Sequence, residues 1–471
     1  MPPFNTSRRD FIRKAATLAV VTGPAARTFA AGGVNSKVNL AFIGIGNRGN
    51  QVAHEFARFQ NLFNVVALAD TEMGHARTLD TLKLFPSAAR FTDFRRMFDA
   101  KAKELDAVVV CTPDSGHFPA AMMTMGLGKH LYIEKPMAHT FREVELMIQS
   151  ARKHKVITQM GNQGHSGPNY YQFKALAQRG FLNDVTRIVA HMNMARRWHK
   201  WNGKIPADAF AAQPLPSGLD WETWLGQNPW HDYNVNYING DWRCWYDFGN
   251  GALGDWGAHI FDTAHEFLDL GLPEQVEVRN VTGHTDKVFP MNSTVIFKFP
   301  ARGQLPACDI EWYEGRTNLP DLPKGYGELK AATDIPSSGN ETYKAIKSLP
   351  PGKEIYTKRG LVLKGGSHGS TLELVGEKDA QIEAILKDFP TGQPDHYKAF
   401  VLAIRGEAKN NSPFELAGPL SQVMCLGCIA QKLNRSFRFD RTTKRIVNDS
   451  VANAMLDGPA PRKGWEAFYK I

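Results

Sequence analysis

A strand, a glycine-rich turn and a helix follow one another in "KVNLAFIGIGNRGNQVAHEF", and this succession constrains the fold more than any other feature of the chain. The apolar run 38–43 predicts a buried strand, and a helix is expected to begin near Asn47. Between them, Gly44 permits a tight turn, Gly46 lets backbone amides approach an anion at the helix N-terminus, and Gly49 lets helix and strand pack closely. The segment therefore predicts the first strand and helix of a parallel sheet.

Strands continue to alternate with helices up to about residue 160. Buried strands are predicted in "NVVALAD", "LDAVVVCTP", "HLYIEKP" and "KVITQMGNQ", and "TFREVELMIQSARKHK" has the pattern of an amphipathic helix between two of them. This alternation predicts an α/β fold whose residues 36–160 form a Rossmann domain with a doubly wound parallel sheet.

The pattern changes after residue 160. "VTRIVAHMNM", "EQVEVRNVTG" and "NSTVIFKFP" read as strands with few helices between them. Residues 161–471 are therefore expected to form a C-terminal α/β domain with a large, mostly antiparallel open sheet. Two irregular insertions, at about 195–250 and 315–362, are expected to lie as loops over one face of that sheet.

An acidic residue, Asp70, ends the second predicted strand 21 residues after Gly49. A carboxylate at this place accepts hydrogen bonds from both hydroxyls of an adenosine ribose and repels a 2′-phosphate. The sequence therefore predicts NAD rather than NADP as the cofactor. Asn47 and Arg48 of the turn are included in the site, although the Arg48 guanidinium could instead bind a 2′-phosphate. The alternative is that the glycines only turn a strand into a helix.

Charge and hydropathy argue against two classes of protein. The net charge is +9, and the first 31 residues contribute nearly half of it, with five basic side chains and one acidic one. Because the remaining excess is not clustered, we expect no nucleic-acid binding. No stretch approaches the roughly 20 consecutive apolar residues of a transmembrane helix, so we expect no stable membrane anchor.

The N-terminus resembles a twin-arginine export signal. "SRRDFIRKAATLAVVTGPAARTFAAGG" joins Arg8 and Arg9 to Phe11 and then to a modestly apolar run that ends in small residues. We expect residues 1–31 to be a cleaved signal peptide, the twin-arginine machinery to be a partner, and the periplasm to be the destination. The alternative is a basic N-terminus before a short helix.

Four segments connect the sequence to a known family. "GIGNRG", "CTPDSGHFPAA", "YIEKPMA" and "GALGDWGAHIFD" resemble the Gfo/Idh/MocA family of sugar oxidoreductases. The likeness runs from about residue 36 to 275. It implies a Rossmann domain followed by an α/β domain whose open sheet carries the substrate on one face, and it implies a homodimer or homotetramer.

The resemblance implies three catalytic residues. Lys135 matches the lysine of the family's E-K-P motif, and Asp255 with His259 matches its D-x-x-x-H pair. The chemistry agrees, because oxidation of a secondary alcohol needs a base for the hydroxyl proton, and a neutral imidazole suits pH 7. Asp255 could orient that ring or bind a neighbouring substrate hydroxyl, and Lys135 could stabilise alkoxide character. The alternatives are a surface lysine and a solvated helix face.

Two of these motifs and the segment "GNQGH" extend the predicted cofactor site to a larger set, namely Thr112, Pro113, His117, Glu134, Lys135, Asn162 and Gln163. Thr112 and Pro113 resemble the family's T-P segment beside the nicotinamide. The amides of Asn162 and Gln163 could reach the nicotinamide ribose. His117 either contributes to the site or caps the start of its helix.

Eight of the ten tryptophans lie between residues 195 and 256. Aromatic faces stack on sugar rings, so Trp198, Trp242 and Trp245 could wall a glycoside subsite. Alternatively, these side chains pack the core of the insertion or a subunit interface. Asp262 is a further candidate, either as a substrate ligand or as a structural partner.

The segment "GDWGAHIFDTAHEFLDLG", residues 254–271, is predicted to be one amphipathic helix whose polar stripe faces a cleft. Asp255 and His259 begin the stripe, whereas His265 and Glu266 are expected in its outer, solvated part. "HEFLD" lacks the second histidine of the H-E-x-x-H pattern, so no metal site is predicted.

The predicted export bears on the reaction. Without a free NAD pool outside the cytoplasm, a dehydrogenase must keep its NAD and regenerate it in place. We favour an oxidoreductase that acts on a secondary hydroxyl of a sugar or glycoside, with tightly bound NAD reoxidised by a second carbonyl compound. The alternative is an NAD-dependent glycoside hydrolase that oxidises the sugar transiently, eliminates the glycosidic bond and returns the hydride. A third possibility is a non-catalytic cofactor-binding protein.

Overall fold

The computed structural model describes residues 37–193, 208–329, 331–332, 346–347 and 349–471. The predicted signal peptide, residues 1–31, and Trp198 lie outside these ranges. Within them, every helix is too short or too polar to cross a lipid bilayer.

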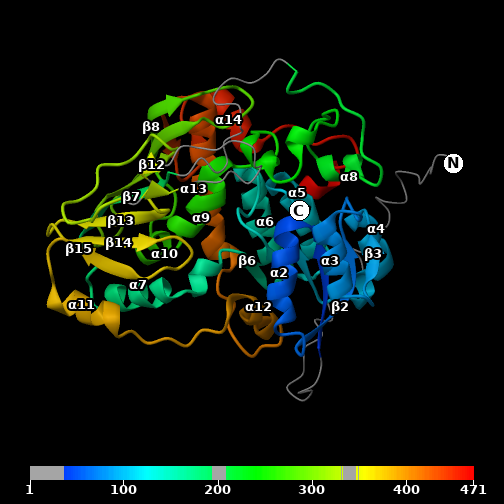
Figure 1. Cartoon of the computed structure of the whole chain (residues 1–471), viewed down its shortest axis with the longest axis horizontal. Helices are drawn as coiled ribbons and strands as arrows, with labels where there is room; N and C mark the ends of the chain where they lie inside the picture. The colour runs from blue at the N-terminus through cyan, green and yellow to red at the C-terminus, as the bar shows by residue number, and fades with distance from the viewer. Residues whose placement is uncertain (1–36, 194–207, 330, 333–345, 348) are drawn as a thin grey trace. The chain divides into compact units, whose positions relative to one another are not determined.

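A six-stranded parallel sheet with the order β3-β2-β1-β4-β5-β6 forms the N-terminal part of the fold (Figure 1). Its strands are β1 Val38–Ile43, β2 Phe63–Ala69, β3 Ala89–Phe91, β4 Ala107–Val110, β5 His130–Ile133 and β6 Thr158–Met160. The helices between them are α2 Asn47–Ala57, α3 Ala76–Leu84, α4 Phe94–Lys101, α5 Asp114–Gly126 and α6 Phe141–His154. The predicted doubly wound sheet is confirmed. Its strand order reverses between β1 and β4, which is where such sheets open a ligand-binding crevice.

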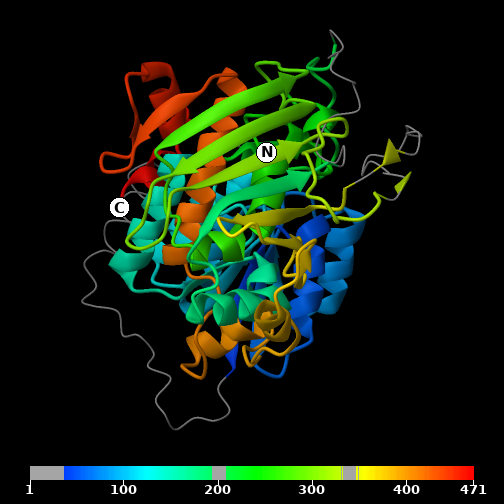
Figure 2. The same ribbon diagram turned by 90° about the vertical axis from the view of Figure 1, so that its left-hand side faces the viewer.

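A nine-stranded sheet follows, with the order β15-β14-β13-β7-β10-β9-β8-β16-β17 (Figure 2). Its strands are β7 Val185–Met192, β8 Gln275–Thr282, β9 Asn292–Phe299, β10 Cys308–Glu314, β13 Gly352–Thr357, β14 Val362–Gly366, β15 Leu372–Val375, β16 Phe437–Asp440 and β17 Arg445–Ile446. The pair β7–β10 is parallel, and every other pair between its described strands is antiparallel. The mostly antiparallel second sheet is therefore confirmed.

The remaining helices are α7 Pro168–Gln178, α8 Trp221–Leu225, α9 Gly251–Ile260, α10 Asp262–Phe267, α11 Ala380–Lys387, α12 His396–Ile404, α13 Phe414–Leu433 and α14 Ser450–Asp457. The longest of them is α13. It packs against α6, which connects β5 to β6, against α9, and against β8 of the second sheet. It approaches α6 closely because Gly418 lacks a side chain: an added Cβ would lie 2.4 Å from an atom of Ile148. The helix α13 thus holds α9 in place between the two sheets.

Part of the second predicted insertion is sheet rather than loop. Gly352–Thr357 forms β13, which pairs with both β7 and β14. Because both faces of this strand are covered, Lys353 and Glu354 are each 1% exposed and the sequence shows no alternation of polar and apolar residues. The expectation of a loop is wrong for this segment, because the prolines and glycines on either side of the strand conceal it in the sequence.

Residues 254–271 form parts of two helices rather than one. The helix α9 ends at Ile260 and α10 begins at Asp262. The helix α13 packs against both of them and α7 packs against α10, so the expectation that His265 lies in a solvated part of the helix is wrong. That ring is 6% exposed, and its Nε2 lies 2.8 Å from the carbonyl oxygen of Gly271.

Candidate active site

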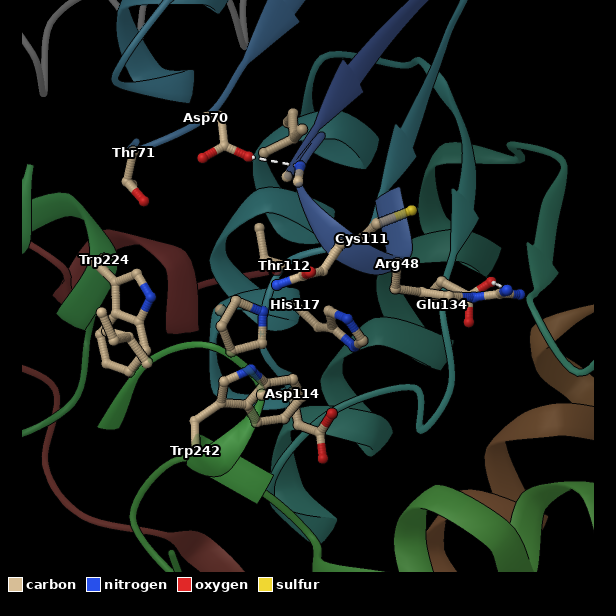
Figure 3. A pocket seen from close by; sticks show the side chains of 18 of the residues that line it. Arg48, Asp70, Thr71, Cys111, Thr112, Asp114, His117, Glu134, Trp224 and Trp242 are labelled. Carbon is tan, nitrogen blue, oxygen red and sulfur yellow. Dashed lines mark hydrogen bonds and ion pairs between the residues drawn. The ribbon is translucent and has the colours of Figure 1, made fainter. Parts of the chain in front are cut away.

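A cavity of about 930 Å³ lies at the carboxyl ends of β1, β2, β4 and β5 (Figure 3). Residues of α9, of the first insertion and of the loop between β14 and β15 complete its wall. The location is the one at which doubly wound sheets bind ligands, and the volume is in the usual range of small-molecule sites. The cavity therefore joins the Rossmann sheet to the residues predicted for catalysis.

The glycine turn has the backbone geometry of a phosphate-binding loop. Gly44 has a φ of +78°, which favours glycine, and a Cβ on Gly49 would lie 1.8 Å from the carbonyl oxygen of Gly44. Gly46, the residue before α2, lines the cavity together with Asn47. The bare backbone at the start of the helix α2 is thus open to a pyrophosphate.

Asp70 follows β2 and binds the backbone of this turn. One carboxylate oxygen accepts hydrogen bonds from the amides of Ile45 at 2.7 Å and Gly46 at 3.0 Å, and the other accepts from Glu72 at 2.9 Å. Burial raises the pKa of Asp70, and the three amides act in the opposite direction. The carboxylate borders the cavity, so its remaining lone pairs fit the ribose hydroxyls of a dinucleotide.

Arg48 points away from Asp70 toward the other end of the cavity (Figure 3). Its Nη2 lies 3.1 Å from Glu134 Oε1 and 3.3 Å from the Tyr397 hydroxyl. Although burial opposes the charge, Glu134 helps to raise the pKa of Arg48. A guanidinium held in this way does not face the ribose side, which favours NAD over NADP at this site.

Lys135 and Asp255 form an ion pair in the cavity wall, with side chains that are 11% and 5% exposed. The Lys135 Nζ donates to the Asp255 carboxylate and, at 3.0 Å, to its main-chain oxygen. Burial lowers the pKa of Lys135, and the charge of Asp255 opposes that shift. The Nε of Arg243 lies 3.6 Å from the same carboxylate, so two cations share it.

His259 lies one helical turn after Asp255 and is 5% exposed. Burial, together with the charge of Lys135, lowers its pKa well below 6.5, so the ring is neutral at pH 7. Its Nδ1 has no hydrogen-bond partner among the described residues. The ring of His368, from the loop after β14, stacks on it with 3.8 Å between ring centroids.

His117 is placed inside α5 and does not cap that helix, whose N-cap residue is Pro113. Its Nδ1 donates to the carbonyl oxygen of Pro136 at 2.8 Å, and burial lowers its pKa to about 4. The Nε2 of His117 and the hydroxyl of Thr112, both on residues that line the cavity, are buried and have no hydrogen-bond partner among the described residues. Such unpaired polar atoms fit a polar ligand, as the nicotinamide end of the cofactor would be.

Two domains of this chain match models of one known protein family. Residues 38–162 match the model of the oxidoreductase family with an NAD-binding Rossmann fold, GFO_IDH_MocA, and residues 168–304 match the C-terminal alpha/beta domain of the same family. The chain belongs to the Gfo/Idh/MocA family.

Two curated relatives of this Gfo/Idh/MocA chain carry glycosidase names. An alpha-N-acetylgalactosaminidase from Bacteroides fragilis is 27% identical over 157 residues, which are 32% of this chain and 36% of the relative. A glycosyl hydrolase family 109 protein from Shewanella pealeana is 25% identical over 166 residues, which are 34% of this chain and 36% of the relative. The chain therefore matches about a third of the length of these relatives.

The fold is also that of a solved family structure. The WlbA dehydrogenase from Chromobacterium violaceum, solved with NADH and UDP-GlcNAcA, superposes with a TM-score of 0.57 over 86% of this chain and 97% of that chain. The sequence identity is 15%, so this likeness concerns the fold alone.

Not every predicted site residue of the Gfo/Idh/MocA chain reaches the cavity. Gln163 lines it, but Asn162 and Asp262 do not. The Asn162 amide donates to Asp262 Oδ1 at 2.8 Å, and His165 Nδ1 donates to the same oxygen at 2.9 Å. Asp262 raises the pKa of the buried His165 against the effect of burial, and Glu266 adds to this. Asp262 is therefore a structural partner, and Asn162 is held by it rather than facing the cofactor.

The tryptophans of the first insertion divide between the two expected roles. Trp242 lines the cavity, and the Arg243 guanidinium lies 4.0 Å from the centroid of its ring. Trp245 packs in the insertion's own core, where its Nε1 donates to the carbonyl oxygen of Asn236 at 2.8 Å. Trp245 is thus a core residue and not a cavity wall.

Three cavity residues carry chemistry that the sequence did not reveal: Asp114, Arg243 and His368. Asp114 accepts a hydrogen bond from the main-chain N–H of Asn250 at 3.0 Å, and burial raises the pKa of Asp114 to about 7. Asp114 stands directly after the T-P segment, which was the available signal. Arg243 and His368 come from an insertion and a loop without a motif. Among the described residues, no group of three or more His, Cys, Asp or Glu side chains is placed to hold a metal ion.

Proposed function

We propose that the protein oxidises a secondary hydroxyl of a sugar or glycoside with a bound NAD. The observation that supports this most directly is the convergence of Lys135, Asp255 and His259 in the cavity that also contains the glycine turn and Asp70. When bound, the nicotinamide ring supplies a hydride acceptor for the carbon that carries the hydroxyl.

His259 supplies the base. Its ring is neutral at pH 7 because burial and the nearby Lys135 cation disfavour imidazolium, so it can take the hydroxyl proton. Asp255 lies on the same helix and stabilises the imidazolium that proton transfer creates. The ring of His368 packs against one face of His259 and limits its rotation.

Lys135 stabilises negative charge on the reacting oxygen. Its ammonium group is buried, and two of its protons are directed to Asp255. The third can be donated to an alkoxide-like oxygen in the cavity. In a site shielded from water, a preorganised cation of this kind accounts for a large part of the rate. Arg243 also pairs with the Asp255 carboxylate. Because one negative charge faces two cations, Asp255 does not fully neutralise Lys135, and the remaining positive charge can stabilise the substrate oxygen.

Sugar-like substrates suit the wall beside the catalytic residues. Trp242 lies at the cavity (Figure 3), and aromatic faces stack on the C–H faces of sugar rings. The Arg243 guanidinium beside Trp242 adds donors for hydroxyl or anionic groups.

Asp114 favours a second candidate, the NAD-dependent glycoside hydrolase. A buried carboxyl group with a pKa of about 7 holds a proton near neutral pH and can protonate a leaving group. The glycosidase names of the two curated relatives support the same possibility.

Product analysis with NAD-loaded protein and no added nucleotide separates the two candidates. The protein is incubated with aryl glycosides and with free sugars, and keto-sugar and released aglycone are measured by mass spectrometry. The oxidoreductase predicts a keto-sugar, in an amount limited by the carbonyl acceptor supplied. Repeated release of aglycone without a keto-sugar or reduced nucleotide would contradict it and establish the hydrolase. In that case Asp114→Asn should abolish aglycone release.

A further inference from the structure

The geometry points to a clamp that closes the adenosine end of the cofactor site and keeps the dinucleotide bound between turnovers. We define the clamp as residues 219–227, which include α8, together with the C-terminal segment 462–469. Both parts lie outside the Rossmann sheet. The inference rests on the NAD of the proposed function, but its evidence is independent of the catalytic residues.

The first part of the clamp is fastened to the loop after β2. The amide of Asp220 donates to the carbonyl oxygen of Thr71 at 2.9 Å, and Leu219 forms an isolated antiparallel bridge with Glu72. Thr71 directly follows Asp70, whose carboxylate fits the adenosine ribose. The clamp therefore contacts the Rossmann domain at the point where the ribose is expected.

Side chains of the clamp form the inner wall at that end. Leu219 and Trp224 line the cavity, and Trp465 of the C-terminal segment lines it as well. Figure 3 shows Trp224 on the same side of the cavity as Thr71. Trp465 packs on Phe94, which follows β3, with 6.1 Å between ring centroids. The β2 and β3 side of the crevice is thus walled by residues from outside the nucleotide-binding domain.

The C-terminal segment holds the first part in place (Figure 1). The Arg462 guanidinium donates to the carbonyl oxygen of Gly226 at 2.6 Å and to that of Glu222 at 2.8 Å. The Arg462 amide donates to the carbonyl oxygen of Gln227 at 2.9 Å. Arg462 lies outside the cavity wall, so it acts on the clamp and not on the ligand.

The Rossmann domain contributes a second fastening. Arg95 at the start of α4 pairs with Glu222 at 3.1 Å, and its guanidinium lies 4.4 Å from the centroid of the Trp465 ring. Arg95 therefore contacts both parts of the clamp. Exit of the adenosine end requires these contacts to break together, which predicts slow release of the dinucleotide.

Release kinetics test the inference without any knowledge of the sugar. The full chain is loaded with NADH and mixed with a large excess of NAD, and the loss of bound-nicotinamide fluorescence gives the dissociation rate. Arg462→Ala removes the anchor, and Trp224→Ala removes the wall while leaving the anchor intact. Each variant should release NADH about tenfold to a hundredfold faster than the unmodified protein, as expected from lost charge-assisted hydrogen bonds or lost packing.

Arg445→Ala is the matched control. Arg445 also lies in the C-terminal part of the chain and binds a carboxylate, that of Asp457, at 2.9 Å, but it does not line the cavity. Its NADH release should be unchanged. If Arg462→Ala does not fold, the rate of NADH release from Trp224→Ala tests the clamp.

Release from Trp224→Ala at the unmodified rate, or rapid exchange in the unmodified protein, would overturn the clamp. Sugar oxidation combined with rapid exchange would contradict the clamp alone. Slow exchange that is accelerated in the variants, without oxidation of any sugar, would support the clamp and contradict the proposed function.

Discussion

Replacing Lys135 by methionine removes the cation that we assign to the reacting oxygen while retaining a side chain of similar length. The Lys135 side chain is 11% exposed and its ammonium group is bound to Asp255, so water does not easily replace it. Loss of one preorganised donor of this kind costs about 2.7–4 kcal/mol in the transition state, or roughly a hundredfold to a thousandfold in rate.

Lys135→Met should lower the free energy of unfolding by less than the full cost of breaking a buried ion pair. Breaking a buried ion pair costs about 3–5 kcal/mol when the remaining charge is left unpaired. Here Arg243 remains 3.6 Å from the Asp255 carboxylate and compensates part of it. Thermal unfolding measures this cost, and pre-steady-state formation of reduced nicotinamide in NAD-loaded protein measures the rate of the chemical step.

Lys353→Met is the matched control, because Lys353 is also a buried lysine but does not line the cavity. It should leave the rate of hydride transfer within about twofold, since it lies outside the reacting groups. It should not lower the free energy of unfolding, because burial lowers the pKa of Lys353 to about 8 and its Nζ has no hydrogen-bond partner among the described residues. Turnover of Lys135→Met at the unmodified rate would refute the assignment of Lys135.

Four further outcomes are expected. Asp70→Asn removes the charge that repels a 2′-phosphate and should narrow the preference for NAD over NADP, measured as the ratio of the two dissociation constants. The pKa of His259 is lowered well below 6.5, so kcat/KM should not fall as pH decreases from 7 through 6.5; an acid limb centred at or above 6.5 would contradict its role as the base. Burial raises the pKa of Glu314 from 4.5 to about 7, so its ionised form destabilises the fold above pH 7. Glu314→Gln should therefore increase the free energy of unfolding by up to about 3 kcal/mol above pH 7, an advantage that disappears as pH falls toward 4.5, as urea titrations at several pH values will show. We also propose export through the twin-arginine route, and replacement of both Arg8 and Arg9 by lysine should leave the protein in the cytoplasm in cell fractionation.

The part of the site that follows from sequence is the part built from short strand-to-helix motifs. Gly44, Gly46 and Asp70 stand at fixed distances from strands, so their meeting at one crevice follows from the parallel sheet. Lys135 also stands at the end of a predicted strand, but its catalytic role follows from the resemblance of E-K-P to the family motif.

The positions of His368 and Arg243 depend on contacts between different segments of the chain. His368 reaches the ring of His259 from a loop more than 100 residues later in the chain. Arg243 reaches Asp255 from an insertion. No periodicity or motif marks either residue, because their positions are set by how the second sheet packs on α9. The same holds for Trp245, which composition alone could not distinguish from the cavity-lining Trp242.

Transfer of deuterium from substrate to nucleotide tests the central claim most directly. NAD-loaded protein is mixed with sugars and glycosides deuterated at single hydroxyl-bearing carbons, and the nucleotide released on denaturation is analysed by mass spectrometry. We predict that one deuterium moves from one substrate carbon to the nicotinamide, and that Lys135→Met suppresses the transfer. A nucleotide that stays unlabelled with every sugar, in protein that binds NAD, would contradict the assignment of this cavity to sugar oxidation.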